Sequence, residues 1–281
     1  MDRTELDERL RDAATLVEEE RWQEALQLLL AQERDHPEDP MLLCLLGATA
    51  REVGAEGQAY EYFRRCLAQN PADPVVLVTA GNGLAALDDP EAESTLRLAA
   101  LTAPGLSLTR LHYGAYLARE GMYEPAIREL EAARALAEED ALVRLELATA
   151  YLLAERTAEG VEEMAEALAR EAQDSWIRLL YALALVEEGR LEEAAEEMHR
   201  AAEDRPEDVE AQLLASLAAA TQGWIDEAWN ALARAEVGGA ADPALLQEVE
   251  EALESDAEAA EALLRGALAP SALRTRLLER S

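Results

Sequence analysis

The chain has 281 residues, of which 50% are apolar but only 4% are aromatic, and Ala, Leu, Glu and Arg dominate. These are strong helix formers, so the composition favours an all-α fold over a sheet. The formal net charge of −34 predicts a surface that repels nucleic acid phosphates and anionic membranes, leaving a basic protein surface as the favoured partner. Two alternative origins of the composition stay open, namely GC-rich coding for the arginines and a salty cytoplasm for the acidity.

No Lys is present, because all 25 basic residues are Arg, which excludes a Schiff-base lysine and the lysine of a phosphate-binding loop. No apolar run approaches the roughly 18 residues that span a bilayer, so we predict no membrane insertion and a cytoplasmic location. Cys44 and Cys66 are too few for a disulfide framework or a zinc cluster. Both fall on apolar helix faces, where a free Cys usually behaves as a small buried side chain.

In chain order, the elements repeat every 34 residues, with one interval of 33. The second helix of each repeat is marked by a small residue followed, one helical turn later, by a bulky apolar one, a pattern that lets neighbouring helices interlock. The small residues are Ala25, Ala59, Ala92, Ala126, Gly160, Ala194 and Ala228, and the bulky ones are Leu29, Phe63, Leu96, Leu130, Met164, Met198 and Leu232.

The first helix of each repeat carries a small residue where it meets its partner, at Ala13, Gly47, Gly81, Gly114, Ala148, Ala182 and Ser216. Gly54, Gly121, Gly189 and Gly223 predict left-handed turns between the two helices. Pro37, Pro71, Pro104 and Pro206 close repeats, whereas Glu138, Ala172 and Ala240 occupy that position in three others. The third repeat is one residue short near Asp88, Asp89 and Pro90.

This pattern resembles the tetratricopeptide repeat (TPR) family over about residues 6 to 241. The resemblance implies a right-handed superhelical solenoid of about seven TPR hairpins, with residues 1–241 as one array. The chain departs from the family where a large aromatic commonly opens the first helix, because it has Arg9, Leu43, Leu77, Arg110, Arg144, Arg178 and Gln212 there.

Residues 242–281 are predicted to cap the array. Asp242 and Pro243 form a helix start, and Ser255 or Asp256 starts a further helix. From Pro270, a short tail helix combines Leu273, Leu277 and Leu278 with Arg274, Arg276 and Arg280, so it is basic and amphipathic in an acidic chain.

Patterns typical of catalysis or metal binding are absent from the sequence. His36, His112 and His199 lie far apart and lack the companion ligands of metal motifs. There is no nucleophile elbow, Gly-rich phosphate loop or calcium loop. We therefore predict that the protein is not an enzyme and uses no metal or cofactor.

The TPR resemblance implies that the first helices line a groove in which ligands commonly lie. One groove column reads Leu10, Cys44, Val78, Leu111, Leu145, Leu179 and Leu213. A second reads Ala14, Ala48, Asn82, Ala115, Thr149, Leu183 and Leu217, and a third reads Asp7, Met41, Val75, Leu108, Leu142, Trp176 and Glu210. The predicted binding residues are Leu111, Leu142, Leu145, Trp176, Leu179, Leu183 and Leu213, with Asn82 and Arg51 as polar contacts.

An apolar trough rimmed by acid suits an amphipathic helix, or an extended segment with apolar anchors and basic flanks. Only Arg51 and Asn82 come near the chemistry of the family's carboxylate-binding members. Two other interpretations of these columns stay open: tight winding buries them between adjacent first helices, or the basic tail helix fills the trough of its own chain or of a neighbouring copy.

The predicted function is a protein-interaction module, an adaptor or chaperone-like protein that binds an apolar or basic segment of another protein. The alternative is a structural scaffold that assembles into a homo-oligomer. The sequence names neither the partner nor the pathway, because proteins of one fold serve unrelated functions.

Overall fold

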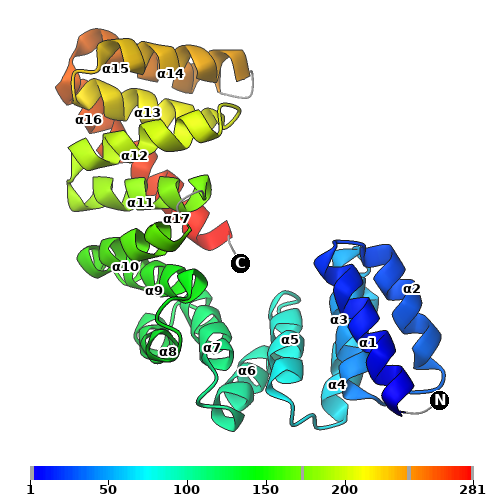
Figure 1. Cartoon of the computed structure of the whole chain (residues 1–281). Coiled ribbons are helices and arrows are strands. Elements are labelled where there is room, and N and C mark those ends of the chain that lie inside the picture. Colours follow the sequence, from blue (N-terminus) through cyan, green and yellow to red (C-terminus); the bar gives the residue numbers. More distant parts are fainter. Residues whose placement is uncertain (1–2, 172–173, 239–241, 280–281) are drawn as a thin grey trace. The chain divides into compact units, whose positions relative to one another are not determined.

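The computed structural model of the chain describes residues 3–171, 174–238 and 242–279, and every regular element in these ranges is helical. The chain divides into two compact units, Met1–Glu120 (unit 1) and Gly121–Ser281 (unit 2). The all-α prediction is therefore confirmed (Figure 1).

Unit 1 contains seven helices, of which the first six form three antiparallel pairs. Their bounds are α1 (Arg3–Glu18), α2 (Trp22–Glu33), α3 (Pro40–Glu52), α4 (Glu56–Ala68), α5 (Pro74–Ala85), α6 (Glu91–Thr102) and α7 (Ser107–Arg119). Each odd-numbered helix of these pairs packs on the even-numbered helix that follows it, and α3 and α5 also pack on each other, as do α5 and α7.

Unit 2 continues the same alternation and ends with a segment that departs from it. Its helices are α8 (Tyr123–Leu136), α9 (Ala141–Leu153), α10 (Thr157–Arg170), α11 (Ser175–Glu188), α12 (Leu191–Asp204), α13 (Val209–Thr221), α14 (Ile225–Gly238), α15 (Pro243–Ser255), α16 (Ala257–Leu263), the π-helical turn η1 (Leu264–Leu268) and α17 (Ala269–Glu279). The pairs α9 and α10, α11 and α12, and α13 and α14 pack as hairpins, as predicted.

An aspartate caps most of the first helices. Asp39, Asp73, Asp140, Asp174 and Asp208 each lie in extended backbone immediately before a helix and accept backbone N–H groups of its first turn. Such a cap satisfies donors that have no partner inside the helix. The repeated Asp therefore fixes where each hairpin begins, including the two repeats whose preceding position lacks Pro.

The turn between the two helices of a hairpin passes through a residue with positive φ. Gly54, Gly121, Gly189 and Gly223 have φ between 73° and 83°, which confirms their predicted role. The remaining hairpin turns place Glu20, Asp88 and Glu155 in the same left-handed conformation, with φ of 57°, 53° and 60°. A side chain there is strained relative to Gly, so these three turns carry a cost that the Gly turns avoid.

The third repeat is one residue shorter than the others in the turn between α5 and α6, as the sequence predicts. In α4, the backbone N–H of Ala59 bonds to the carbonyl of Ala55, four residues earlier, whereas in α6 the N–H of Ala92 bonds to that of Asp89, three residues earlier. The start of α6 is thus tightened by one residue, and Ala92 still reaches its buried position.

Small residues allow the helices of unit 1 to pack closely. Phe63 of α4 is buried, and its ring lies where side chains on Gly47 of α3 and Gly83 of α5 would stand. A Cβ atom on Gly83 would come within 2.2 Å of the ring, a distance that no packed side chain tolerates. The predicted small-to-large interlocking is therefore present at the α3, α4 and α5 contact.

Two of the arginines that stand where the family commonly has a large aromatic form ion pairs with the second helix of their hairpin. Arg144 of α9 donates from Nη1 to Glu163 of α10 at 2.8 Å and from Nε to the carbonyl of Glu138 at 3.0 Å. One hairpin later, Arg178 of α11 pairs with Glu197 of α12 at 2.7 Å. A charge-assisted bond to the second helix thus does what aromatic packing commonly does.

The C-terminal helix starts also agree with prediction, since Asp242 caps α15 with Pro243 in its first turn and Asp256 caps α16. Pro270 lies in α17 directly after η1. A proline ring displaces the carbonyl four residues earlier, which accounts for the widened turn, where Ala269 N–H bonds to the carbonyl of Leu264. Ala172, Ala240 and Arg280, and the predicted boundary after residue 241, lie outside the described residues.

Candidate functional site

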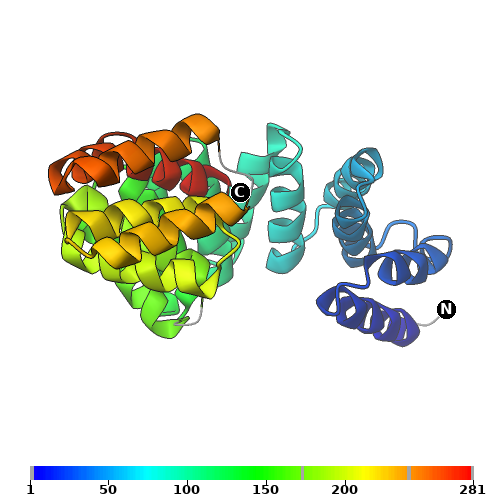
Figure 2. The same cartoon turned by 90° about the horizontal axis from the view of Figure 1, so that it is seen from above.

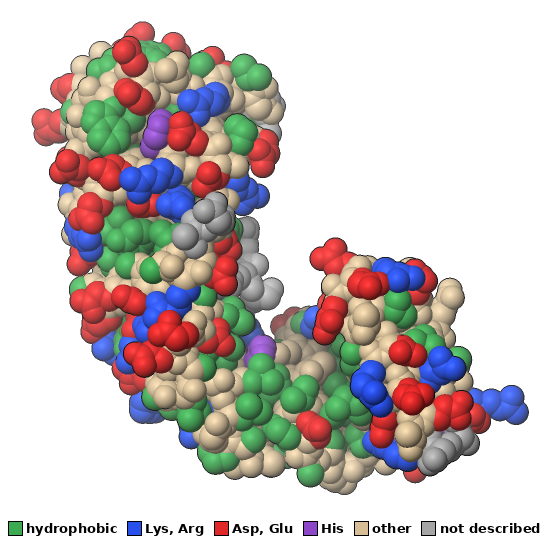
Figure 3. Space-filling view, in the orientation of Figure 1, with side chains coloured by type: hydrophobic (Ala, Val, Ile, Leu, Met, Phe, Trp, Pro, Cys, Tyr) green, Lys and Arg blue, Asp and Glu red, His purple; other side chains and the backbone are tan. Residues whose placement is uncertain are grey.

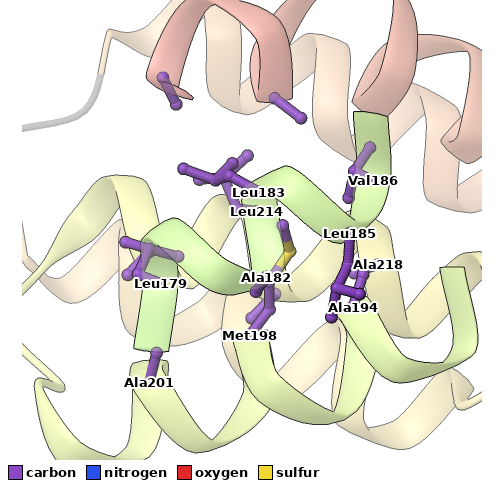
Figure 4. Packing of buried hydrophobic residues seen from close by; sticks show 14 of the residues in the cluster. Leu179, Ala182, Leu183, Leu185, Val186, Ala194, Met198, Ala201, Leu214 and Ala218 are labelled. Carbon is purple, nitrogen blue, oxygen red and sulfur yellow. The ribbon is translucent and has the colours of Figure 1, made fainter. Parts of the chain in front are cut away.

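We define the first-helix face of unit 2 as the surface formed by α9, α11 and α13. Four predicted binding residues on it, Leu145, Leu179, Leu183 and Leu213, belong to one buried cluster, and each is at most 3% exposed. Figure 4 shows Leu183 on the side of α11 nearer the C-terminal helices, and Ala182 on the side nearer Met198 of α12. The structure thus brings the four leucines together but leaves none of them open to solvent.

The C-terminal segment of the chain covers this face. Helix α16 and turn η1 pack on α13, while α17 packs on α11 and, at its edge, on α9. Figures 1 and 2 both show the red helix α17 lying beside the stacked helices of unit 2. Its Leu273 and Leu277 are each 7% exposed and join the same cluster as Leu145 and Leu179. Of the interpretations left open by the sequence, the tail helix lying on its own chain is the one observed in unit 2.

Charge also fixes α17. The guanidinium of Arg276 donates to Glu210 of α13 at 2.6 Å and lies 3.4 Å from Asp208, the residue that caps α13. The Arg276 side chain is 13% exposed, so it is largely desolvated in this contact. The tail therefore combines apolar side chains with an arginine directed at two carboxylates.

Two predicted residues on the rim of this face remain accessible. Leu142, in the first turn of α9, is 43% exposed, and Trp176, in the first turn of α11, is half-buried against the edge of the cluster. Both belong to the third groove column, as does Glu210, which receives the tail arginine. This column is thus the accessible margin of the face.

The predicted residues of unit 1 do not gather at one point. Leu111 of α7 is buried, and Arg51 at the end of α3 pairs with its neighbour Glu52 at 2.7 Å. Asn82 of α5 is half-buried, and its amide nitrogen lies 2.9 Å from Nδ1 of His112 on α7. Burial, and to a lesser degree Arg119, lowers the pKa of His112, so the imidazole next to Asn82 favours its neutral form.

Unit 1 has an open pocket on its own first-helix face, which α1, α3 and α5 form. Its volume is about 530 Å³, within the range of ligand-binding clefts. We call it the unit 1 pocket; it is lined by Arg3, Asp7, Leu10, Arg11, Ala14, Asp39, Pro40, Met41, Leu45, Pro71, Ala72, Asp73 and Val76. Apolar side chains make most of its wall, and two of its lining residues, Arg3 and Asp39, form an ion pair.

None of the predicted binding residues lines this pocket. Three of its lining residues, Asp7, Ala14 and Met41, nevertheless occur in the groove columns predicted from the sequence. Most of the predicted binding residues lie in the later repeats, which are richer in leucine. Small residues such as Ala14 mark an open hollow better than leucines do, because large apolar side chains tend to be covered.

The surface carries many carboxylates, and Figure 3 shows acidic side chains over the visible surface of both units with arginines between them. Within residues 3–171, 174–238 and 242–279, no group of three His, Cys, Asp or Glu side chains is arranged to hold a metal ion. In the same ranges, no helix has the length and apolar character needed to cross a membrane.

Comparison with known proteins assigns the fold. Residues 140–223 match the model of a family described as an uncharacterised Treponema protein. No curated protein sequence matches the chain. Among solved structures, TTC0263, a thermophilic TPR protein of Thermus thermophilus, is 27% identical with a TM-score of 0.54, over 64% of this chain and 98% of that one.

Two further solved structures agree. The C-terminal part of a TPR repeat-containing protein from Cytophaga hutchinsonii is 15% identical with a TM-score of 0.62, over 85% of this chain and 98% of that one. YrrB, described as a TPR protein with an unusual peptide-binding site, is 19% identical with a TM-score of 0.57, over 68% and 99%. Together with the hairpin order, these neighbours show that the chain is an all-α protein with the fold of a tetratricopeptide repeat solenoid.

Proposed function

We propose that the protein is a non-enzymatic interaction module, an adaptor or chaperone-like protein, that binds a segment of another protein along its first-helix faces. The fold supports protein binding in general, since TPR proteins typically act as binding modules. The bound segment carries apolar anchors with basic flanks, because the faces are apolar and the chain has a net charge of −34.

The observation that carries the proposal is the unit 1 pocket. It is open, and a single anchor side chain with its neighbours fits its volume of about 530 Å³. Met41 stands among its apolar residues, while the carboxylate of Asp7 in its lining is paired with Arg3 at 3.1 Å. On the proposed function, Met41 contacts the anchor, and the net negative charge of the chain attracts the basic flank. Asn82 on unit 1, and Leu142 and Trp176 on unit 2, provide contacts on their own faces.

The test is a selection of displayed random peptides on the immobilised full-length chain, followed by affinity measurements with variants. We expect the selected peptides to carry apolar residues flanked by Arg or Lys. Replacing Met41→Arg is expected to weaken their binding at least tenfold, because it puts a charge into the apolar wall. The matched control is Leu101→Arg on α6, where a leucine that is 71% exposed lies away from the first-helix faces.

Selected peptides that bind the Met41→Arg variant as well as they bind the wild type contradict a site at this pocket. Selection of no peptides at all contradicts the interaction module. Sedimentation velocity over a range of concentrations distinguishes the alternative scaffold, which predicts a defined oligomer where the interaction module predicts a monomer.

A further inference from the structure

We propose that α17 occupies, on the first-helix face of unit 2, the place that a helix of a partner protein takes when it binds. The partner helix carries two apolar side chains one turn apart with an arginine between them, as α17 does with Leu273, Arg276 and Leu277, and it displaces α17 from the first-helix face of unit 2. This inference rests on the proposed function and names the class of ligand for one of its faces.

Helix α17 lies outside the repeat. The helices α1 to α14 follow one period in the sequence, and within each unit every second helix packs on the first helix that follows it. Helix α17 does not continue this stacking, because it packs on the first helices α11 and α9 instead of extending the row. It lies on the first-helix face of unit 2, where the proposed function places a bound segment, and not in the position of a further repeat.

The contact between α17 and the first-helix face of unit 2 combines apolar burial with an ion pair. Leu273 and Leu277 are buried against the cluster that contains Leu179 and Leu213. Arg276, on the same stretch of helix, reaches Glu210 at 2.6 Å. This is the amphipathic, basic ligand that an apolar face with an acidic margin selects.

The connection between α16 and α17 is irregular. The π-helical turn η1 and Pro270 interrupt the regular hydrogen bonding between α16 and α17. The regular helical hydrogen-bond pattern therefore does not continue from α16 into α17. The two helices also meet different first helices, since α16 packs on α13 and α17 on α11 and α9.

A tethered helix competes strongly with a free one. Its effective concentration on a short linker is on the order of millimolar. A free peptide of the same sequence with a micromolar dissociation constant for the uncovered face would therefore bind wild type on the order of a thousandfold more weakly. Weakening the attachment of α17 removes this competition.

The experiment measures binding of a fluorescein-labelled synthetic peptide with the sequence of residues 264–281 to the full-length chain by fluorescence anisotropy. The chain is used as wild type and as the double variant Leu273→Asp, Leu277→Asp, whose tail no longer docks. We expect the double variant to bind the peptide at least a hundredfold more tightly than wild type does. Circular dichroism of both chains checks that the hairpins remain folded.

Peptide variants test the charge contact. Arg276→Glu in the peptide is expected to weaken binding at least tenfold, and Glu210→Arg in the double-variant chain is expected to restore it. Arg274→Glu is the matched control, because Arg274 is exposed on the same helix. If the double variant has lost its helices, the chain variant Arg276→Glu, which keeps the apolar contacts, replaces it in the titration.

A folded double variant that does not bind the peptide, or a wild type that binds it equally well, overturns the inference. A complex in which two chains exchange α17, seen as a dimer in sedimentation, also overturns it, because the occupant is then a second copy. If the double variant binds the peptide of residues 264–281 as expected but the selection of displayed random peptides yields no binder, the proposed function is refuted. Selection through the unit 1 pocket without peptide exchange refutes this inference alone.

Discussion

Removing the carboxylate of Glu163 is expected to destabilise unit 2 by about 3 to 5 kcal/mol. Glu163 of α10 accepts from Arg144 of α9 at 2.8 Å with one oxygen, and from Arg134 of α8 with the other. The side chains of Arg144 and Glu163 are each 9% exposed. The variant Glu163→Ala leaves the Arg144 guanidinium desolvated without a counter-charge, which is the costly way to break a buried pair.

Two companion variants make this prediction specific. Replacing both partners, as Arg144→Leu with Glu163→Leu, removes the unpaired charge and is expected to cost far less than Glu163→Ala, or to stabilise the chain. The control Glu159→Ala removes a surface pair with Arg156. The two side chains are 45% and 44% exposed, so the loss of this pair is expected to cost far less than Glu163→Ala.

Urea unfolding followed by helical circular dichroism measures each change in the free energy of unfolding. The reasoning is refuted if Glu163→Ala costs no more than Glu159→Ala. It is also refuted if the double replacement is as destabilising as the single one, because the loss then comes from packing and not from an unpaired charge.

Three further changes test the backbone, the packing and the protonation. Glu155→Gly is expected to stabilise the chain by about 1 kcal/mol in urea unfolding, since it relieves a left-handed residue; a destabilised variant would contradict strain at this turn. Gly83→Ala is expected to destabilise by about 1 to 3 kcal/mol because of the Phe63 ring, whereas Gly57→Ala, with open space around it, costs nothing; equal effects would contradict the close contact. Burial lowers the pKa of His112, so unfolding takes up a proton there and stability is lost as the pH falls below about 6.5; the variant His112→Gln should lack this component of the pH profile.

The sequence was sufficient for the hairpins because their signals are local. Most first helices start at a capping Asp, and Gly189 or Gly223 in a turn reports its own backbone conformation. The turn at Glu155 could not be predicted in the same way, because a glutamate gives no sign of a positive φ. Its conformation is imposed by the packing of α9 on α10, which tertiary contacts decide.

The arginine column escaped prediction for a different reason. An arginine near the start of a helix is typical of a solvated position, yet Arg144 and Arg178 are held by carboxylates 19 residues later, on the second helix of the same hairpin. Only the pairing of first and second helices brings these groups together. The departure from the family's aromatic is thus an exchange of one interhelical contact for another, and the hairpin geometry is kept.

The two first-helix faces differ because of the size of one column of side chains. In unit 1 this column has Ala14, which lines the unit 1 pocket, whereas in unit 2 it has Leu183 and Leu217, both fully buried. Leaving a leucine in water instead of burying it costs about 1.5 to 3 kcal/mol. The leucines of this column in unit 2 therefore need a cover, which the chain supplies with its C-terminal segment, whereas the smaller Ala14 leaves the hollow of unit 1 open. It follows that a ligand that displaces α17 from α11 has to bury Leu183 as well as α17 does, whereas a ligand of unit 1 has only to fill a hollow.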